Sequence, residues 1–100
     1  MIVATLNQML ARRFIVRGRV QGVGFRWFVE REARNIGVVG WVRNNEDSTV
    51  ELLAAGSAEQ LADLRARLAQ GPRASRVDAV DEFEAAPDQS LKSFQIQGAW

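Results

Sequence analysis

The spacing of apolar residues along the chain predicts alternating strands and helices. The stretch RFIVRGRVQG, which begins at Arg13, contains several β-branched residues, and Phe14 and Val16 alternate in it with Ile15 and Arg17. This pattern is typical of a strand, which we place at about 12–19. Beyond its glycines, apolar residues recur at helical spacing and predict an amphipathic helix over about 25–36 that ends at Gly37. The apolar stripe of this helix consists of Phe25, Val29, Ala33 and Ile36.

The second half of the chain repeats the alternation. Two strands, at about 38–45 and 49–55, are predicted around a short turn rich in Asn, Asp and Ser, which indicates a hairpin. Ser57 and Gln60 have the spacing of a capping box, and three leucines follow at helical intervals, so a second helix is expected over about 58–70. The stretches SRVDAVDEFEAA and KSFQIQGAW show short apolar alternations, and each predicts a strand.

This order of elements predicts a fold class. Strand, helix, strand, strand, helix and strand, with one extra strand at the end, form the split βαβ plan. We therefore predict an α+β protein in which an antiparallel sheet of four to five strands carries two helices on one face. At 100 residues the chain is long enough for one domain, which we expect to span 12–100 after an N-terminal extension of residues 1–11. The same order of elements occurs in enzymes, RNA-binding domains and regulatory ligand-binding domains, so the fold alone does not determine the function.

Composition narrows the possible chemistry. With 47% hydrophobic and 25% charged residues, the sequence is that of an ordinary globular protein. It contains neither cysteine nor histidine, which removes disulfides, thiol nucleophiles and the usual zinc and haem ligands. A net charge of +1 is smaller than the basic excess of a dedicated nucleic-acid-binding domain. The N-terminal stretch has the pattern of neither a signal peptide nor a membrane span, so we expect a cytoplasmic protein with no membrane partner.

The stretch VQGVGFR, where the first strand meets the first helix, is a candidate anion site. The first N–H groups of a helix lack intrahelical partners and carry partial positive charge. Gly22 and Gly24 allow the loop to turn its N–H groups inward, and Arg26 adds a planar set of donors that matches two phosphate oxygens. On spacing alone, a plain turn followed by a surface arginine explains the stretch equally well.

A second candidate lies in the stretch GWVRNNED, where a strand enters the predicted hairpin turn. Asn44 can donate and accept hydrogen bonds without a change of charge, which suits the holding of a water molecule or a substrate oxygen. Local hydrogen bonding to the backbone beside the turn is the alternative role for this residue. Trp41 is most simply a core or sheet-face aromatic residue.

Taken together, GRVQGVGFR at 18–26 and GWVRN at 40–44 closely resemble the two motifs of the acylphosphatases, and the resemblance runs from about Arg13 through the final strand. It implies a ferredoxin-like (βαββαβ) two-layer sandwich that hydrolyses the carboxyl–phosphate bond of small acyl phosphates. The catalytic arginine of the family falls on Arg26 and its water-positioning asparagine on Asn44. Its phosphate-binding loop falls on Gln21, Gly22, Val23, Gly24, Phe25 and Arg26.

The resemblance also implies how the reaction proceeds. An acyl phosphate expels a carboxylate whose conjugate acid has a pKa of roughly 4–5, so the reaction needs no strong general acid. We therefore expect direct attack of a water molecule, without a cofactor or a metal, in a monomer that binds no nucleic acid and is inhibited by its product, inorganic phosphate. Two other readings remain open: a noncatalytic phosphate- or anion-binding domain, and an RNA-binding ferredoxin-like domain.

The predicted hairpin turn departs from the family pattern. Asn45 stands where threonine is common, and Ser48 stands where glycine is usual. Because a turn that requires a positive φ is unfavourable for any residue other than glycine, Ser48 is expected either to strain this turn or to select another turn type.

Overall fold

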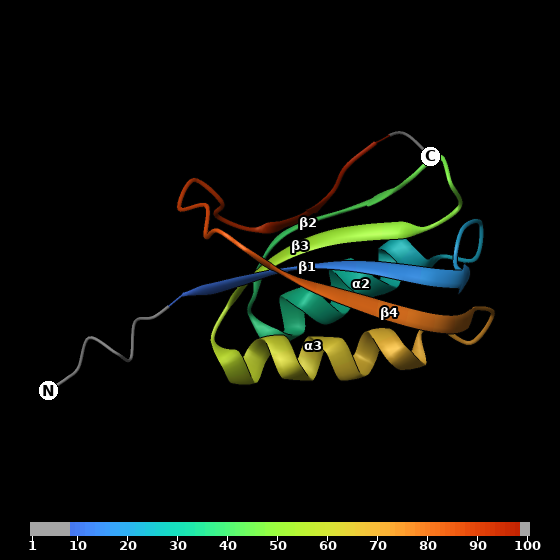
Figure 1. Cartoon of the computed structure of the whole chain (residues 1–100), viewed down its shortest axis with the longest axis horizontal. Coiled ribbons are helices and arrows are strands. Elements are labelled where there is room, and N and C mark those ends of the chain that lie inside the picture. The colour runs from blue at the N-terminus through green and yellow to red at the C-terminus, as the bar shows by residue number, and fades with distance from the viewer. Residues whose placement is uncertain (1–8, 99–100) are drawn as a thin grey trace, which may run out of the picture.

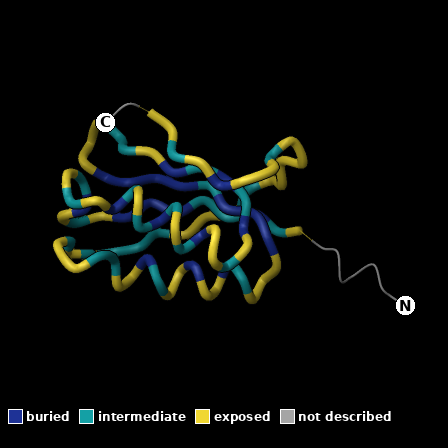
Figure 2. Tube along the Cα trace, turned by 180° about the vertical axis from the view of Figure 1, so that it is seen from behind, coloured by how far each residue is buried: buried dark blue, intermediate teal, exposed yellow. Residues whose placement is uncertain are grey.

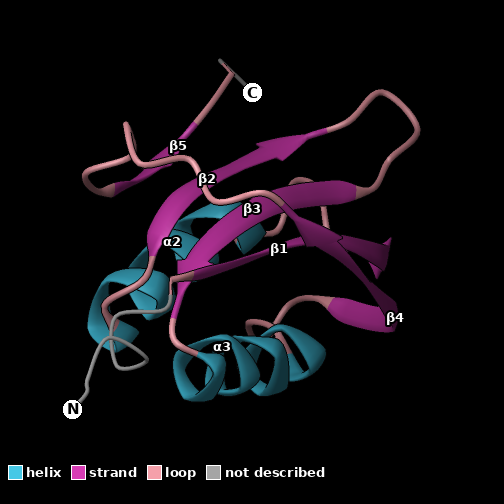
Figure 3. Ribbon diagram, turned by 60° about the vertical axis from the view of Figure 1, so that its left-hand side comes forward, coloured by secondary structure: helices cyan, strands magenta, loops and turns pink. Residues whose placement is uncertain are grey.

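The computed structural model describes residues 9–98 and shows a five-stranded sheet with both helices packed on one face (Figures 1 and 3). This arrangement confirms the predicted fold class, and the bounds of both helices agree with the prediction. In chain order the elements are β1 (Leu10–Arg19), α2 (Phe25–Ile36), β2 (Val39–Asn44), β3 (Val50–Gly56), α3 (Ala58–Gln70), β4 (Arg76–Ala85) and β5 (Phe94–Ile96).

Strand β1 begins two residues earlier than the sequence pattern predicts. Ala11 is 1% exposed and pairs with Ala55 of β3 on one side and with Ala85 of β4 on the other. Leu10 and Ala11, the last residues of the predicted extension, are therefore part of the sheet. The earlier part of that extension, residues 1–8, lies outside the described residues.

The order of strands in the sheet is β4-β1-β3-β2-β5. The first four strands pair antiparallel, as predicted, but β5 runs parallel to β2, with Phe94 opposite Gly40, so the prediction of a wholly antiparallel sheet is wrong for this strand. The reason is the position of the connection. Strand β4 ends at the end of the sheet where β2 begins, and residues 86–93 cross that same end, so β5 must set out in the direction of β2 (Figure 1).

One hydrophobic core lies between the sheet and the helices. Alternate strand residues and the apolar stripes of α2 and α3 meet there, and Figure 2 shows that the buried segments follow the strands while the turns are exposed. The largest of the fully buried side chains are Phe14, Phe25, Phe94, Leu52, Leu64 and Leu68. The predicted capping box starts α3, because the Ser57 hydroxyl accepts from the Gln60 N–H at 3.1 Å and the Gln60 side chain accepts from the Ser57 N–H at 2.9 Å. Within residues 9–98, neither helix has the length and apolarity needed to cross a bilayer.

The fold places the two candidate motifs at one end of the sheet. Strands β1 and β2 run in the same direction because each is antiparallel to β3, which lies between them. The loop at 20–24 follows the end of β1 and leads into α2, and Asn44 is the last residue of β2. Both motifs therefore lie where these strands end, although β3 separates the strands.

We predict that Phe94 anchors β5 in the sheet. Its side chain is 0% exposed, so Phe94→Ala is expected to lower the free energy of unfolding by about 3–5 kcal/mol. The same truncation at Phe83, which is 43% exposed on β4, is expected to cost about 1 kcal/mol or less. Urea unfolding of both variants measures the difference. Equal losses would show that β5 does not depend on this contact.

Candidate active site

Helix α2 begins without a side-chain cap. Gly24, the N-cap residue, has φ 79°, and Gly22 in the same loop has φ 73°; both lie in the left-handed region, which costs other residues about 1–2 kcal/mol. The Gly24 carbonyl accepts from the Phe28 N–H at 3.0 Å, so helical bonding starts at this residue and the N–H groups of the first turn have no intrahelical partner. A Cβ added at either glycine would meet no atom within 4 Å, so the loop is open on that side.

A pocket of about 200 Å³ lies against this helix start and brings the two motifs together. Its lining residues are Val20, Gly22, Gly24, Phe25, Arg26, Trp27 and Asn44. Of the residues predicted for the site, Gln21 and Val23 do not line this pocket. Val23 packs partly buried against the core instead. We call this space the phosphate pocket, after the group that the sequence motifs predict there.

Arg26 and Asn44 reach the phosphate pocket from different elements. Arg26 lies in the first turn of α2, directly after Phe25, whose buried ring anchors that turn in the core. Asn44 closes β2, two residues after Val42, which is 0% exposed on the face that carries the helices. Since side chains alternate along a strand, Asn44 points to the same face as Val42 and therefore toward α2. Arg26, which carries a positive charge, and Asn44, which carries a neutral amide, thus line one small pocket.

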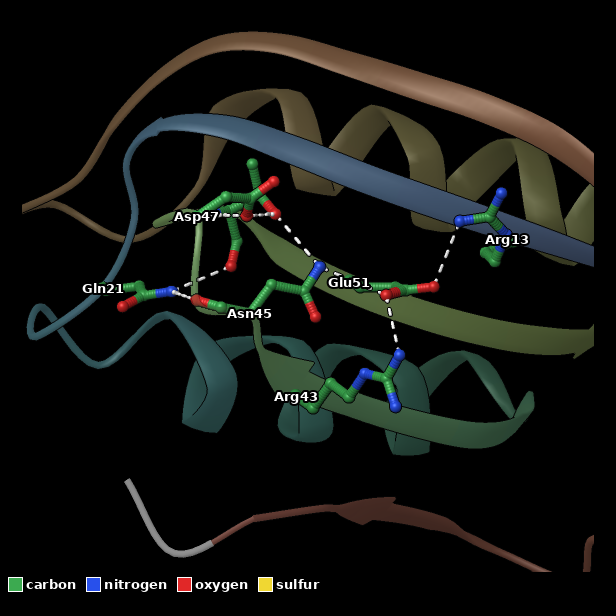
Figure 4. Close-up of polar contacts among 7 residues, drawn as sticks. Arg13, Gln21, Arg43, Asn45, Asp47 and Glu51 are labelled. Atoms are coloured by element: carbon green, nitrogen blue, oxygen red, sulfur yellow. Dashed lines mark hydrogen bonds and ion pairs between the residues drawn. The ribbon is translucent and has the colours of Figure 1, made fainter.

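The side chain of Gln21 joins the loop to the neighbouring hairpin. Its Nε2 donates to the carbonyl of Asn45 at 2.8 Å and to the carbonyl of Thr49 at 2.9 Å (Figure 4). The sequence indicates only the backbone of Gln21 as a phosphate ligand, and this side-chain role is missed because its partners lie 24 and 28 residues away. Gln21 therefore fixes the distance between the loop before α2 and the turn that follows Asn44.

The hairpin turn contains the strained residue that the sequence indicates. Ser48 has φ 77°, and it is the one residue other than glycine with a positive φ among residues 9–98. The Asn45 N–H donates to the Thr49 carbonyl at 2.9 Å, and the Asn45 side chain donates to the Thr49 hydroxyl at 3.1 Å. Asp47 accepts from both the N–H and the hydroxyl of Thr49, at 3.1 and 2.6 Å. These bonds hold the turn against the unfavourable conformation of Ser48.

Beyond the turn, a carboxylate on the open face of the sheet supports Asn45. Glu51 is 8% exposed, and it accepts from Arg13 at 3.1 Å, from Arg43 at 3.0 Å and from the Asn45 side chain at 3.1 Å (Figure 4). Burial raises the pKa of Glu51, but the hydrogen bonds from Arg43, Asn45 and Arg13 outweigh it, so this pKa is lowered from its ordinary value. The carboxylate thus remains charged and orders the residue that follows Asn44.

Trp27 is a pocket residue to which the sequence motifs assign no role. The residue lines the phosphate pocket together with Arg26 and is 70% exposed. A signal was available: Trp27 lies two positions after Phe25, outside the apolar stripe of α2, so helical periodicity places it on the polar face.

Comparisons with known proteins point to one family. A family model described as acylphosphatase matches residues 12–96. The chain is 58% identical over 89 residues to an acylphosphatase of Koribacter versatilis strain Ellin345, with 89% of this chain and 81% of the relative covered. It is 48% identical over 89 residues to an acylphosphatase of Pasteurella multocida strain Pm70, with 89% and 99% covered. The crystal structure of an acylphosphatase from Bacillus subtilis superposes with a TM-score of 0.85 at 38% identity, with 89% and 99% covered.

The Glu51 contacts predict a pH-dependent stability. Because its folded-state pKa lies below the ordinary value of 4.5, the Glu51 carboxylate stabilises the fold above that pH, and this contribution disappears as pH falls through the folded-state pKa. Glu51→Gln is expected to lower the free energy of unfolding by about 1–3 kcal/mol near neutral pH, and the difference from the parent should shrink below pH 4.5.

Urea unfolding from neutral to acid pH measures this difference. The control is Glu46→Gln, which removes an exposed carboxylate from the same hairpin turn. It should leave the free energy of unfolding within about 0.5 kcal/mol of the parent at neutral pH. A Glu51→Gln difference that stays constant across the pH range would contradict the role assigned to the carboxylate.

Proposed function

The chain belongs to the acylphosphatase family, whose reaction is hydrolysis of the carboxyl–phosphate bond of acyl phosphates, and we propose that it performs this reaction in the phosphate pocket through Arg26 and Asn44. One observation carries the proposal. Two motifs from separate elements, the start of α2 and the end of β2, line the same space of about 200 Å³. A phosphoryl group bound there would face cationic and N–H donors on one side and a neutral amide on the other.

Arg26 and the first turn of α2 hold the phosphoryl group. The guanidinium offers paired N–H donors that match two phosphoryl oxygens, and the open N–H groups of the helix start face a third. Positive φ values at Gly22 and Gly24 keep the loop backbone turned without a Cβ in the way. Charge on the phosphoryl oxygens is the main quantity that must be stabilised in phosphoryl transfer, and these donors are positioned before the reaction begins.

Asn44 holds the attacking water. The amide accepts a hydrogen bond from the water and leaves an oxygen lone pair directed at phosphorus. As the water oxygen bonds to phosphorus, the bond from phosphorus to the carboxyl oxygen breaks, the carboxylate leaves with that electron pair, and a phosphate oxygen takes the proton of the water. The products are a carboxylate and inorganic phosphate, and no phosphoenzyme forms.

This mechanism requires little else from the protein. The leaving carboxylate has a conjugate acid with a pKa of roughly 4–5, so it departs without a proton donor. Arg26 and the helix N–H groups supply the positive charge that a metal ion supplies in other phosphoryl-transfer enzymes. We accordingly propose a monomeric cytoplasmic enzyme that works without a metal and is inhibited by inorganic phosphate, which presents the same tetrahedral oxygens as the transferred group.

The first prediction from this mechanism concerns the two side chains. Arg26→Ala and Asn44→Ala are each expected to fold and to lose roughly 10²–10³-fold in kcat/KM for benzoyl phosphate, because each removes a prepositioned contact to the reacting atoms. Arg31→Ala and Asn35→Ala change the same residue types at exposed positions of α2 and should stay near the parent rate. Circular dichroism confirms folding, and near-normal turnover by either pocket variant would remove that residue from the mechanism.

The second prediction concerns charge at the pocket. Inorganic phosphate is expected to raise the melting temperature of the parent and to inhibit turnover over the same concentration range, because it binds the folded state. Both effects should be lost in Arg26→Ala and kept in Arg31→Ala.

Turnover of benzoyl phosphate in excess chelator should equal that in buffer alone. Stabilisation by phosphate without turnover would indicate a binding domain, and loss of activity in chelator would indicate a required metal.

A further inference from the structure

A second, wider pocket lies beside the phosphate pocket, and the mechanism does not use it. This second pocket has a volume of about 600 Å³, and we call it the wide pocket. One wall is the surface of α2 from Arg26 to Arg34, and the opposite wall is formed by β5 and Gly98. The two pockets share Arg26 and Trp27. A substrate whose phosphoryl group sits in the first pocket would therefore carry its acyl group beside these two residues, next to the second pocket.

Trp27 is placed to contact the acyl group of such a substrate. A single exposed apolar side chain needs no explanation on a protein surface. Trp27 is different because this residue is 70% exposed and lines both pockets, directly beside the residue proposed to bind the phosphoryl group. Trp41 offers the contrast within the same chain. It lines a separate pocket and lies under the Arg43 guanidinium, 4.9 Å from the ring centroid.

The charges of the wide pocket indicate which acyl groups fit. Arg34 forms an ion pair with Glu30 at 3.2 Å and also donates to the Phe94 carbonyl at 3.0 and 3.2 Å. Its positive charge is therefore already balanced within the wall. A second carboxylate or phosphate on the substrate would find no uncompensated partner at Arg34, whereas a planar uncharged group could lie against the indole.

We propose that Trp27 forms the acyl-binding subsite of this enzyme and that it selects acyl phosphates with an aromatic, uncharged acyl group over small aliphatic ones. This inference rests on the proposed placement of the phosphoryl group at Arg26. Aromatic rings stack on or pack edge-to-face against an indole, and this contact adds to the apolar area removed from water. An acetyl group is too small to gain much from either effect.

The test compares benzoyl phosphate with acetyl phosphate, which share the reacting group and differ in the acyl part. Trp27→Ala is expected to lower the ratio of kcat/KM for benzoyl phosphate to that for acetyl phosphate by about two- to tenfold. Trp27→Phe should keep most of the ratio because it retains a ring. Phe83→Ala removes an exposed ring from the far edge of the sheet and should leave the ratio unchanged.

Inhibition by phosphonates separates binding from turnover. Phenylphosphonate should inhibit acetyl phosphate hydrolysis more strongly than methylphosphonate in the parent, and Trp27→Ala should remove that preference. Equal losses for both substrates, or an unchanged ratio, would overturn the subsite while the proposed function stands. If the parent turned over neither acyl phosphate, the proposed function would fail first, whatever the behaviour of Trp27.

Discussion

The open N–H groups at the start of α2 are the feature on which the site depends. They exist because Gly22 and Gly24 take positive φ values and because no side chain caps the helix. A helix start left open in this way needs an anion or water to satisfy it, and Arg26 adds positive charge at the same point. The fold keeps this start in place by burying Phe25 and Val29 beneath it, so the binding donors are rigid before any substrate arrives.

A network of hydrogen bonds extends this rigidity to the second half of the site. Gln21 ties the loop to the hairpin, Asn45 ties the hairpin to Glu51, and Arg13 and Arg43 hold the Glu51 carboxylate from neighbouring strands. In the proposed mechanism such a chain of contacts is useful beside Asn44, since a water molecule must be aligned with phosphorus to react. It also accounts for the tolerance of a strained residue in the adjoining turn.

The chemistry of the substrate explains how so small a chain without histidine or cysteine can be an enzyme. A carboxylate leaves without assistance, so the protein has to supply only position and charge, and in the proposed mechanism one helix start and one strand end provide these. What remains of the surface near the pocket is then available for recognition of the acyl group. Trp27, an exposed residue that lines both pockets, is the residue that we propose for that task.

The sequence by itself determined the features that arise from neighbouring residues. Both helices were predicted with their observed bounds, because periodicity, capping residues and terminal glycines act within a few positions. It also indicated the strained Ser48, whose conformation is local. The two motifs also indicated that Arg26 and Asn44 act together, but only through their resemblance to a family. Only the tertiary structure decided the parallel direction of β5, the bridge from Gln21 to the hairpin and the pocket that Arg26 and Asn44 line together. Each depends on how segments that are distant in the sequence pack against one another.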